Sequence, residues 1–87
     1  MPLQVTPHPT PNPNAYKFVL GGKRFDKAAT FASAEAAKGT PFAEALFRIA
    51  EVQSIFCTAD FVTVTKGPGG DWGRIVPAAA EALRDNL

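Results

Sequence analysis

The sequence has almost no cysteine or histidine, the side chains that most often bind transition metals and serve as strong nucleophiles or bases. Its 87 residues include one cysteine, Cys57, and one histidine, His8. A single cysteine excludes an intrachain disulfide and a zinc site built from cysteines. Cysteine catalysis also needs a nearby base or positive charge, and no histidine, lysine or arginine flanks Cys57 in the sequence. We therefore predict no metal site, no cofactor and no catalytic residue.

Excess charge and long apolar runs are also missing. Nine Lys and Arg against eight Asp and Glu give a net charge of +1. The basic residues are scattered, whereas a nucleic-acid-binding surface needs them clustered. The acidic residues show no paired spacing typical of acid–base catalysis, so we expect no enzyme. No apolar stretch approaches the roughly 18 residues of a membrane span, and the N-terminus lacks a signal peptide. Together with the free thiol, this predicts a cytoplasmic protein that binds neither nucleic acid nor membranes.

Apolar and polar residues alternate in several short segments, which is the pattern of half-buried strands. Segment 16–20 places its aromatic residues and its leucine on one face. Gly21-Gly22 is expected to end this strand in a tight turn with positive φ. Prolines at every second position over residues 7–13 predict a stiff, extended connector after the first strand. The last two strands are expected to form a hairpin around residues 58–60. The five predicted strands are residues 3–6, 16–20, 24–33, 52–57 and 61–66.

Two segments carry apolar residues at helical spacing. The first helix is expected to start at Thr40-Pro41, an N-cap residue followed by a proline suited to the first turn. The second is expected to be capped by Asp71 and to kink or restart near Pro77, which cannot donate a backbone hydrogen bond. The predicted apolar faces are Phe42, Ala45, Leu46 and Ile49 in the first helix, and Trp72, Ile75, Val76, Ala79, Leu83 and Leu87 in the second.

These elements follow one another in the order β-β-β-α-β-β-α. Two amphipathic helices and a set of half-buried strands are best buried when both helices cover one face of a sheet. The predicted fold class is therefore α+β, a two-layer α/β arrangement with a mostly antiparallel sheet. The sequence shows no internal repeat and no linker, so residues 1–87 are predicted to form a single domain.

A glycine-rich stretch before the second helix has the superficial form of a phosphate-binding loop. Such loops aim backbone N–H groups at an anion above a helix N-terminus. The stretch Gly67-Pro68-Gly69-Gly70 lacks the Gly-Lys-Ser/Thr ending of that motif, and Asp71 places a negative charge where the anion would lie. We therefore interpret this stretch as a turn.

Four segments of the chain stand out when they are read in order. They are TPNPNAYKF (10–18), PFAEALF (41–47), VQSIF (52–56) with DFVTVTK (60–66), and DW (71–72) followed by Pro77. These segments resemble the motifs TPNPNALKF, SPLAKALF, VKSVFF…DFITVTK, and DW followed by (L/I)xP of the N-terminal domain of Nfu/NifU-type iron–sulfur scaffold proteins. The resemblance covers about residues 5–87 and implies a two-layer α/β domain.

The resemblance implies a domain that accompanies iron–sulfur cluster assembly and delivery. In the family's full scaffold proteins, a second domain supplies a Cys-x-x-Cys pair, and two such pairs in a dimer ligate the cluster. The present sequence contains no such pair, and two copies would offer only two Cys57 thiolates. We therefore expect a non-catalytic accessory or protein-interaction module that does not itself ligate a cluster in the family's way.

The expected partners are iron–sulfur assembly or recipient proteins, and a separate protein with a Cys-x-x-Cys pair is one candidate. The chain itself is expected to be a monomer or a weak dimer. Candidate docking residues are Asn12, Asn14, Lys17 and Asp60, because polar groups on a rigid scaffold suit partner recognition. Asn12 and Asn14 could instead cap the backbone in Asx-turns. The alternative function is a thiol-based redox or metal-relay protein that uses Cys57, which is otherwise a small buried residue.

Overall fold

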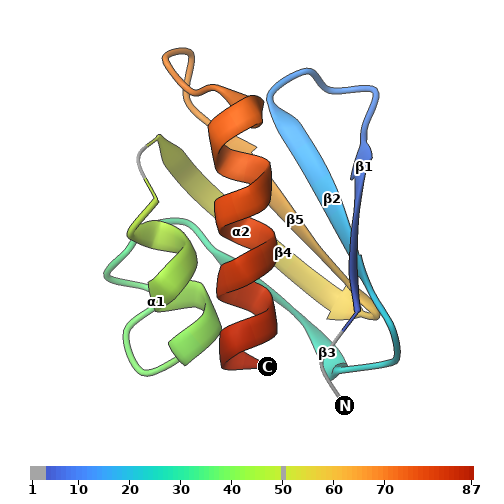
Figure 1. Cartoon of the computed structure of the whole chain (residues 1–87). Coiled ribbons are helices and arrows are strands. Elements are labelled where there is room, and N and C mark those ends of the chain that lie inside the picture. The colour runs from blue at the N-terminus through green and yellow to red at the C-terminus, as the bar shows by residue number, and fades with distance from the viewer. Residues whose placement is uncertain (1–3, 50) are drawn as a thin grey trace.

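The chain folds into one five-stranded antiparallel sheet with two helices against one of its faces (Figure 1). The structure, a computed structural model, describes residues 4–49 and 51–87. Its elements are β1 (Val5–Pro9), β2 (Ala15–Leu20), β3 (Phe25–Phe31), α1 (Pro41–Phe47), β4 (Val52–Ala59), β5 (Phe61–Lys66) and α2 (Trp72–Asn86). The strand order across the sheet is β1-β2-β5-β4-β3. The predicted α+β class and the order of elements are confirmed.

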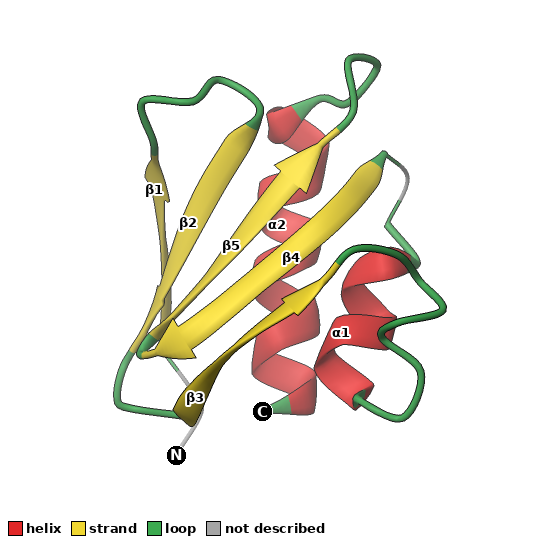
Figure 2. Cartoon of the chain, turned by 180° about the vertical axis from the view of Figure 1, so that it is seen from behind, coloured by secondary structure: helices red, strands yellow, loops and turns green. Residues whose placement is uncertain are grey.

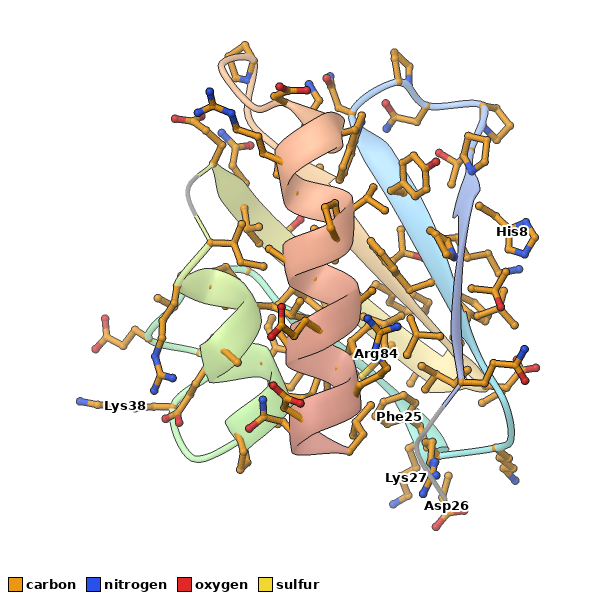
Figure 3. All side chains as sticks on the ribbon, viewed as in Figure 1. His8, Phe25, Asp26, Lys27, Lys38 and Arg84 are labelled. Atoms are coloured by element: carbon orange, nitrogen blue, oxygen red, sulfur yellow. The ribbon has the colours of Figure 1, made fainter. Side chains whose placement is uncertain are left out.

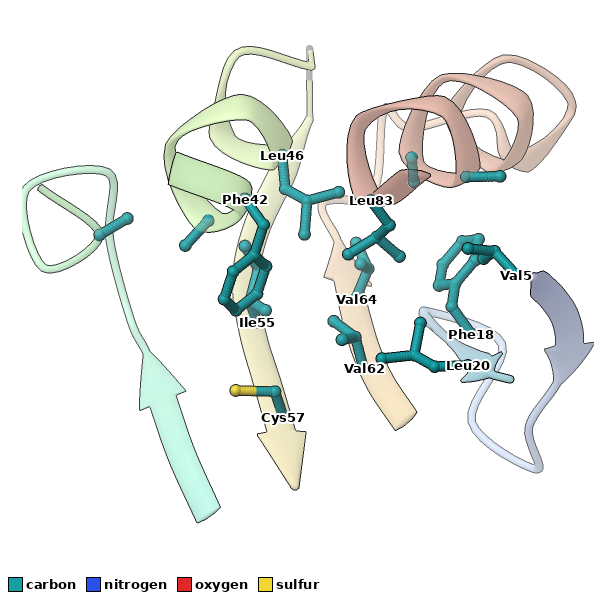
Figure 4. Packing of buried hydrophobic residues seen from close by; sticks show 14 residues of the cluster. Val5, Phe18, Leu20, Phe42, Leu46, Ile55, Cys57, Val62, Val64 and Leu83 are labelled. Atoms are coloured by element: carbon teal, nitrogen blue, oxygen red, sulfur yellow. The ribbon is translucent and has the colours of Figure 1, made fainter. Parts of the chain in front are cut away.

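The hydrophobic core lies between the sheet and the two helices. Figure 2, the view from behind, shows the strands in front of both helices, so the opposite face of the sheet is not covered by a helix. Figure 4 shows strand and helix side chains meeting in the layer between them. Buried positions alternate along β2, β4 and β5, as the two-residue period of a strand requires. The buried cluster comprises Val5, Phe18, Leu20, Ala37, Phe42, Ala43, Leu46, Ile55, Cys57, Val62, Val64, Ala79, Ala80 and Leu83.

The first strand extends further into the proline segment than predicted. β1 reaches Pro9, where the sequence pattern had placed a connector, and Leu3 lies outside the described residues. Proline cannot donate a backbone hydrogen bond, but β1 is an edge strand and pairs only with β2. An edge strand needs donors on one side only. Prolines at alternate positions, Pro7 and Pro9, are therefore compatible with it, and they also hinder pairing of its free edge with another chain.

The tight turn predicted at Gly21-Gly22 is wrong. β2 and β3 are not neighbours, because β5 and β4 lie between them in the sheet. The connecting segment runs past the end of the β4–β5 hairpin, where the amide of Leu20 donates to the carbonyl of Asp60 at 2.6 Å. Among the described glycines only Gly39 has a positive φ, of 91°. The chain passes from β2 to the opposite edge of the sheet instead of turning back into a hairpin. Gly21 and Gly22 therefore need no left-handed conformation.

The β4–β5 hairpin is tighter than predicted. Thr58 pairs with Phe61, so the turn consists of two residues, Ala59 and Asp60. Ala59 takes up the left-handed conformation, with φ of 49°. β4 consequently extends two residues beyond Cys57, the predicted end of the strand.

Helix α1 is shorter than its apolar pattern indicates. It ends at Phe47, so Ile49 packs against the core from the following turn rather than from the helix. Thr40 occupies the N-cap position, but its side chain makes no capping hydrogen bond. A carboxylate oxygen of Glu44 instead accepts from the amide of Gly39 at 3.0 Å.

Helix α2 is continuous through Pro77, which corrects the expected restart. Asp71 caps the helix as predicted, and its carboxylate accepts from the amide of Gly73 at 2.9 Å. Pro77 removes only the backbone hydrogen bond to the fourth residue before it, Gly73. The buried residues of α2 are Ile75, Ala79, Ala80 and Leu83, while Trp72, Val76 and Leu87 pack against the core at its margin.

Candidate functional site

Three of the segments that carry the family resemblance meet at one end of the sheet. The turn between β1 and β2 lies against the end of β5, where the amide of Lys66 donates to the carbonyl of Asn14 at 2.8 Å. The Lys66 ammonium also lies 3.3 Å from the side-chain oxygen of Asn14. We call this cluster the motif corner and define it as residues 10–16, Lys66 and Trp72. It joins positions more than fifty residues apart in the sequence.

Trp72, the first residue of α2, completes the motif corner. Its indole nitrogen donates to the carbonyl of Pro13 at 2.9 Å. Its ring centroid lies 5.1 Å from that of Tyr16 on β2, and the Lys66 ammonium lies 5.8 Å from the Trp72 ring. These contacts fasten the β1–β2 turn, the end of β5 and the start of α2 to one another. The motif corner is therefore a structural clamp.

The turn is also held internally. The side-chain oxygen of Asn12 accepts from the amide of Asn14 at 2.9 Å, which is the Asx-turn predicted for Asn12. The hydroxyl of Thr10 accepts from the amide of Asn12 at 3.2 Å and lies 2.9 Å from the carbonyl oxygen of Ala15. Asn14 does not form a second Asx-turn, because its side-chain oxygen contacts Lys66. Docking by Asn12 or Asn14 stays a prediction.

The four residues predicted as docking candidates do not form one cluster. Asn12 and Asn14 lie in the motif corner, next to the end of β5. Asp60 lies at the other end of β2, beside Leu20. Lys17 lies between these ends on the sheet face that carries no helix. A docking surface centred on Lys17 would therefore consist of residues other than Asn12, Asn14 and Asp60.

Those neighbours are aromatic. The Lys17 ammonium lies 4.5 Å from the centroid of the Phe61 ring, close enough for a cation–π interaction. The ring of Phe56 lies 6.2 Å from that of Phe61, and Phe56 is 38% exposed. Sequence analysis missed both phenylalanines as surface residues. A signal was present, because Ile55, Phe56 and Cys57 are consecutive apolar residues, and a strand must place the middle one on the opposite face.

Cys57 points into the core and is 1% exposed (Figure 4). Burial raises the pKa of its thiol above the ordinary value, and a hydrogen bond from the backbone of Ala29 only partly opposes this rise. A reactive thiol needs the opposite shift. Within residues 4–49 and 51–87, no three His, Cys, Asp or Glu side chains are placed to hold a metal ion. Cys57 is therefore a small buried core residue in this structure, rather than an accessible thiol.

We expect Cys57 to react slowly with iodoacetamide at pH 7. A buried thiol reacts only when the fold opens, and open states have populations on the order of 10⁻³ or less. The native chain should therefore be alkylated at least about a thousandfold more slowly than the same chain unfolded in urea. Mass spectrometry of timed samples gives both rates. Equal rates in the two conditions would show that Cys57 is accessible in the native state.

The glycine-rich loop is a turn, as predicted. The amide of Gly70 donates to the carbonyl of Gly67 at 3.0 Å, and the amide of Gly67 donates to the carbonyl of Glu51 at 2.8 Å. The loop borders a cleft that is also lined by Glu51, Asp71 and Arg74. Two carboxylates at this position repel a phosphate, so the cleft does not resemble a nucleotide site.

In the part of the chain that the structure describes, neither helix has the length and apolar character to cross a membrane. The fold is a two-layer α+β domain in which the motif corner joins the β1–β2 turn, the end of β5 and the start of α2.

A family model described as "Scaffold protein Nfu/NifU N terminal" matches residues 5–87. The chain therefore belongs to the Nfu/NifU N-terminal domain family, as the four sequence segments predicted. The NFU1 iron–sulfur cluster scaffold homologues of Drosophila grimshawi and Drosophila ananassae, named as mitochondrial, are 40% and 38% identical to it over 78 residues. These matches cover 87% of this chain but only 26% and 27% of the relatives, so the chain spans about a quarter of their length.

Two solved structures are similar in fold. A NifU-like protein from Saccharomyces cerevisiae superposes with a TM-score of 0.84 at 23% identity, over 97% of this chain and 77% of the other. A Staphylococcus aureus protein superposes with a TM-score of 0.77 at 23% identity, over 95% and 99% of the two chains. At these identities the likeness concerns the fold alone, and it agrees with the predicted α+β architecture.

Proposed function

We propose that this chain is a non-catalytic accessory module that docks on proteins of iron–sulfur cluster assembly or on the proteins that receive clusters. The observation that carries the proposal is membership of the scaffold family over residues 5–87, in a chain whose only thiol is buried. In this view the cluster is cargo of the partner, and residues 1–87 act as one folded recognition unit. The relatives named as iron–sulfur cluster scaffolds support the link to cluster assembly, although this chain spans about a quarter of their length.

The alternative, a thiol-based redox or metal relay through Cys57, has less support. A relay thiol must ionise and meet its partner, whereas Cys57 is 1% exposed and burial raises its pKa. Cys57→Ala tests this alternative, because alanine removes the sulfur without adding a polar group to the core. Unchanged partner binding in this variant is expected under the docking proposal. Loss of binding by a variant that is still folded would favour the relay.

The cellular compartment of the chain is also a prediction. One free thiol suits a reducing environment, and the cytoplasm remains our prediction, whereas the Drosophila relatives are named as mitochondrial. Fractionation of the source cells with an antibody against the chain distinguishes the two.

We expect the immobilised chain to capture iron–sulfur assembly or recipient proteins from an anaerobic lysate of its source cells. A module of this kind would act by binding its partners. The partners should therefore be enriched on the immobilised chain and identifiable by mass spectrometry. An unrelated domain of similar size and charge serves as the control bait. Capture that contains no iron–sulfur assembly or recipient protein beyond the control would contradict the proposed function.

A further inference from the structure

Figure 2 shows the sheet from the side that carries no helix. The strand register places the side chains of this face in continuous rows across the strands. Its central row crosses all five strands, since the register pairs His8 with Lys17, Lys17 with Thr63, Thr63 with Phe56, and Phe56 with Thr30. A second row pairs Thr6 with Val19, Val19 with Phe61, and Phe61 with Thr58. We call these nine residues the open face: His8, Lys17, Thr63, Phe56, Thr30, Thr6, Val19, Phe61 and Thr58.

The charge on the open face has one sign. Strands β1, β2, β5 and β4, which are adjacent in the sheet, contain no Asp or Glu. The acidic residues lie in the helices, in the connections and at Asp26 on the far edge strand β3, where Asp26 approaches Lys23 at 4.0 Å. Lys17 is the full positive charge near the centre of the open face, and His8 is its cross-strand neighbour. A carboxylate that reaches this face therefore meets Lys17 and no like charge among the nine residues of the open face.

The Lys17 ammonium is held in place but is not neutralised. It lies over the Phe61 ring at 4.5 Å, and among the described residues it makes no ion pair within 4.0 Å. Its side chain is half-buried, so water screens the charge less than it screens a fully exposed lysine. An incoming carboxylate would thus find a positioned cation, and little side-chain entropy would be lost on contact.

Apolar surface lies beside this charge. Phe56 is 38% exposed and its ring lies 6.2 Å from that of Phe61, which in turn pairs with Val19 across the strands. Threonines are the cross-strand neighbours of both rings: Thr63 and Thr30 pair with Phe56, and Thr58 pairs with Phe61. Aromatic residues next to a cation on a flat, rigid surface are typical of interface centres.

We propose that the open face binds a segment of a partner protein that carries carboxylates together with a large apolar side chain. A carboxylate would pair with Lys17, and the apolar side chain would pack on Phe56 and Phe61. This identification of the surface rests on the proposed docking function, whose partner it describes chemically. A second copy of the chain is not the proposed occupant. In a face-to-face dimer, the Lys17 of each copy would approach an open face whose nine residues include no Asp or Glu, so neither ammonium would gain an ion pair.

The size of the open face indicates a weak, short-lived complex. The open face has five positions in one row and four in the other; at roughly 4.8 Å between strands and roughly 7 Å between rows, they give a footprint on the order of 300 Å². A standard stable interface buries about 800 Å² on each partner. Affinities in the micromolar range or weaker are therefore expected for an isolated segment.

A displayed library of random 12-residue peptides, selected on the immobilised full chain, tests the proposal. We expect the enriched peptides to combine net negative charge with at least one Phe, Leu, Ile or Trp. Lys17→Glu should weaken synthetic copies of these peptides roughly tenfold or more, because a like charge then faces their carboxylates. Phe56→Ser should weaken them severalfold. Far-ultraviolet circular dichroism and thermal unfolding establish that each variant is folded.

The matched control is Lys38→Glu, which makes the same charge change far from the open face, on the α1 side of the molecule (Figure 3). It should leave peptide binding unchanged. Enrichment of basic or uncharged peptides, no enrichment at all, or equal losses with Lys38→Glu and Lys17→Glu would each overturn the proposal. Concentration-dependent self-association that Lys17→Glu abolishes, measured by analytical ultracentrifugation, would replace the partner segment with a second copy and overturn it as well.

The outcome is separable from that of the proposed function. If the chain captures iron–sulfur proteins and Lys17→Glu captures them equally well, the docking function stands and the open face is the wrong surface. If acidic peptides bind the open face but capture contains no iron–sulfur assembly or recipient protein, the surface stands and the proposed function fails.

Discussion

Phe18→Ala is expected to lower the free energy of unfolding by about 3–5 kcal/mol, the usual cost of removing a buried phenylalanine ring. Phe18 lies in the middle of β2, is fully buried, and contacts the ring of Tyr16 at 5.8 Å between centroids. A chain of this length has a total stability of roughly 4–13 kcal/mol. The variant should therefore be largely unfolded if the parent is at the lower end. Urea titration followed by the fluorescence of Trp72 measures the change.

The matched control for this prediction is Phe56→Ala, the same substitution on the opposite face of the sheet. Phe56 is 38% exposed, so its truncation removes less buried surface, and we expect a loss of about 1 kcal/mol. Comparable losses for the two variants would contradict the placement of the core between the sheet and the helices.

Trp72→Ala is expected to cost about 2–4 kcal/mol, because it removes a half-buried ring and the hydrogen bond to Pro13 together. The ring of Tyr16 would lose its neighbour, and the β1–β2 turn would lose its tether to α2. Thermal or urea unfolding followed by far-ultraviolet circular dichroism measures the loss, since the variant has no tryptophan for fluorescence.

Trp72→Phe separates the two contributions of the indole. Phenylalanine keeps an aromatic ring beside Tyr16 but cannot donate to the carbonyl of Pro13, so we expect a loss of about 1 kcal/mol, typical of one hydrogen bond. Equal losses for Trp72→Phe and Trp72→Ala would place the whole effect in the indole N–H. No loss in either variant would show that the motif corner does not stabilise the fold.

The motif corner gives a physical reason for the sequence resemblance. The family motif at residues 10–18, the lysine that ends β5 and the tryptophan that begins α2 look independent in the sequence. In the structure, Lys66 bonds to Asn14 and Trp72 bonds to Pro13, so the three segments form one clamp. Residues that recur together in this way need not mark a binding loop, which is why the docking roles of Asn12 and Asn14 remain predictions.

The candidate site could be predicted only in part. Lys17 was predicted as a docking residue because it is a polar position of an alternating strand, and polar groups on a rigid scaffold suit partner recognition. Its aromatic neighbours were not identified, since Phe61 lies forty-four residues further along the chain and reaches Lys17 only through the pairing of β2 with β5. A similar limit applied to Gly21-Gly22, where the local preference for a tight turn gave way to a strand order that separates β2 from β3.

By itself the sequence determined the order of the elements, the fold class, the cap at Asp71 and the family, because periodicity, capping and motif identity are local properties of a chain. It also showed that these 87 residues contain one cysteine and no Cys-x-x-Cys pair. Only the tertiary structure decided that Cys57 is buried, that the motif segments form a clamp, and that one sheet face carries Lys17 beside two phenylalanines without a carboxylate. The physical reason is that burial and electrostatic surroundings depend on strand register and strand order, and these are set by how the two helices and five strands share one core.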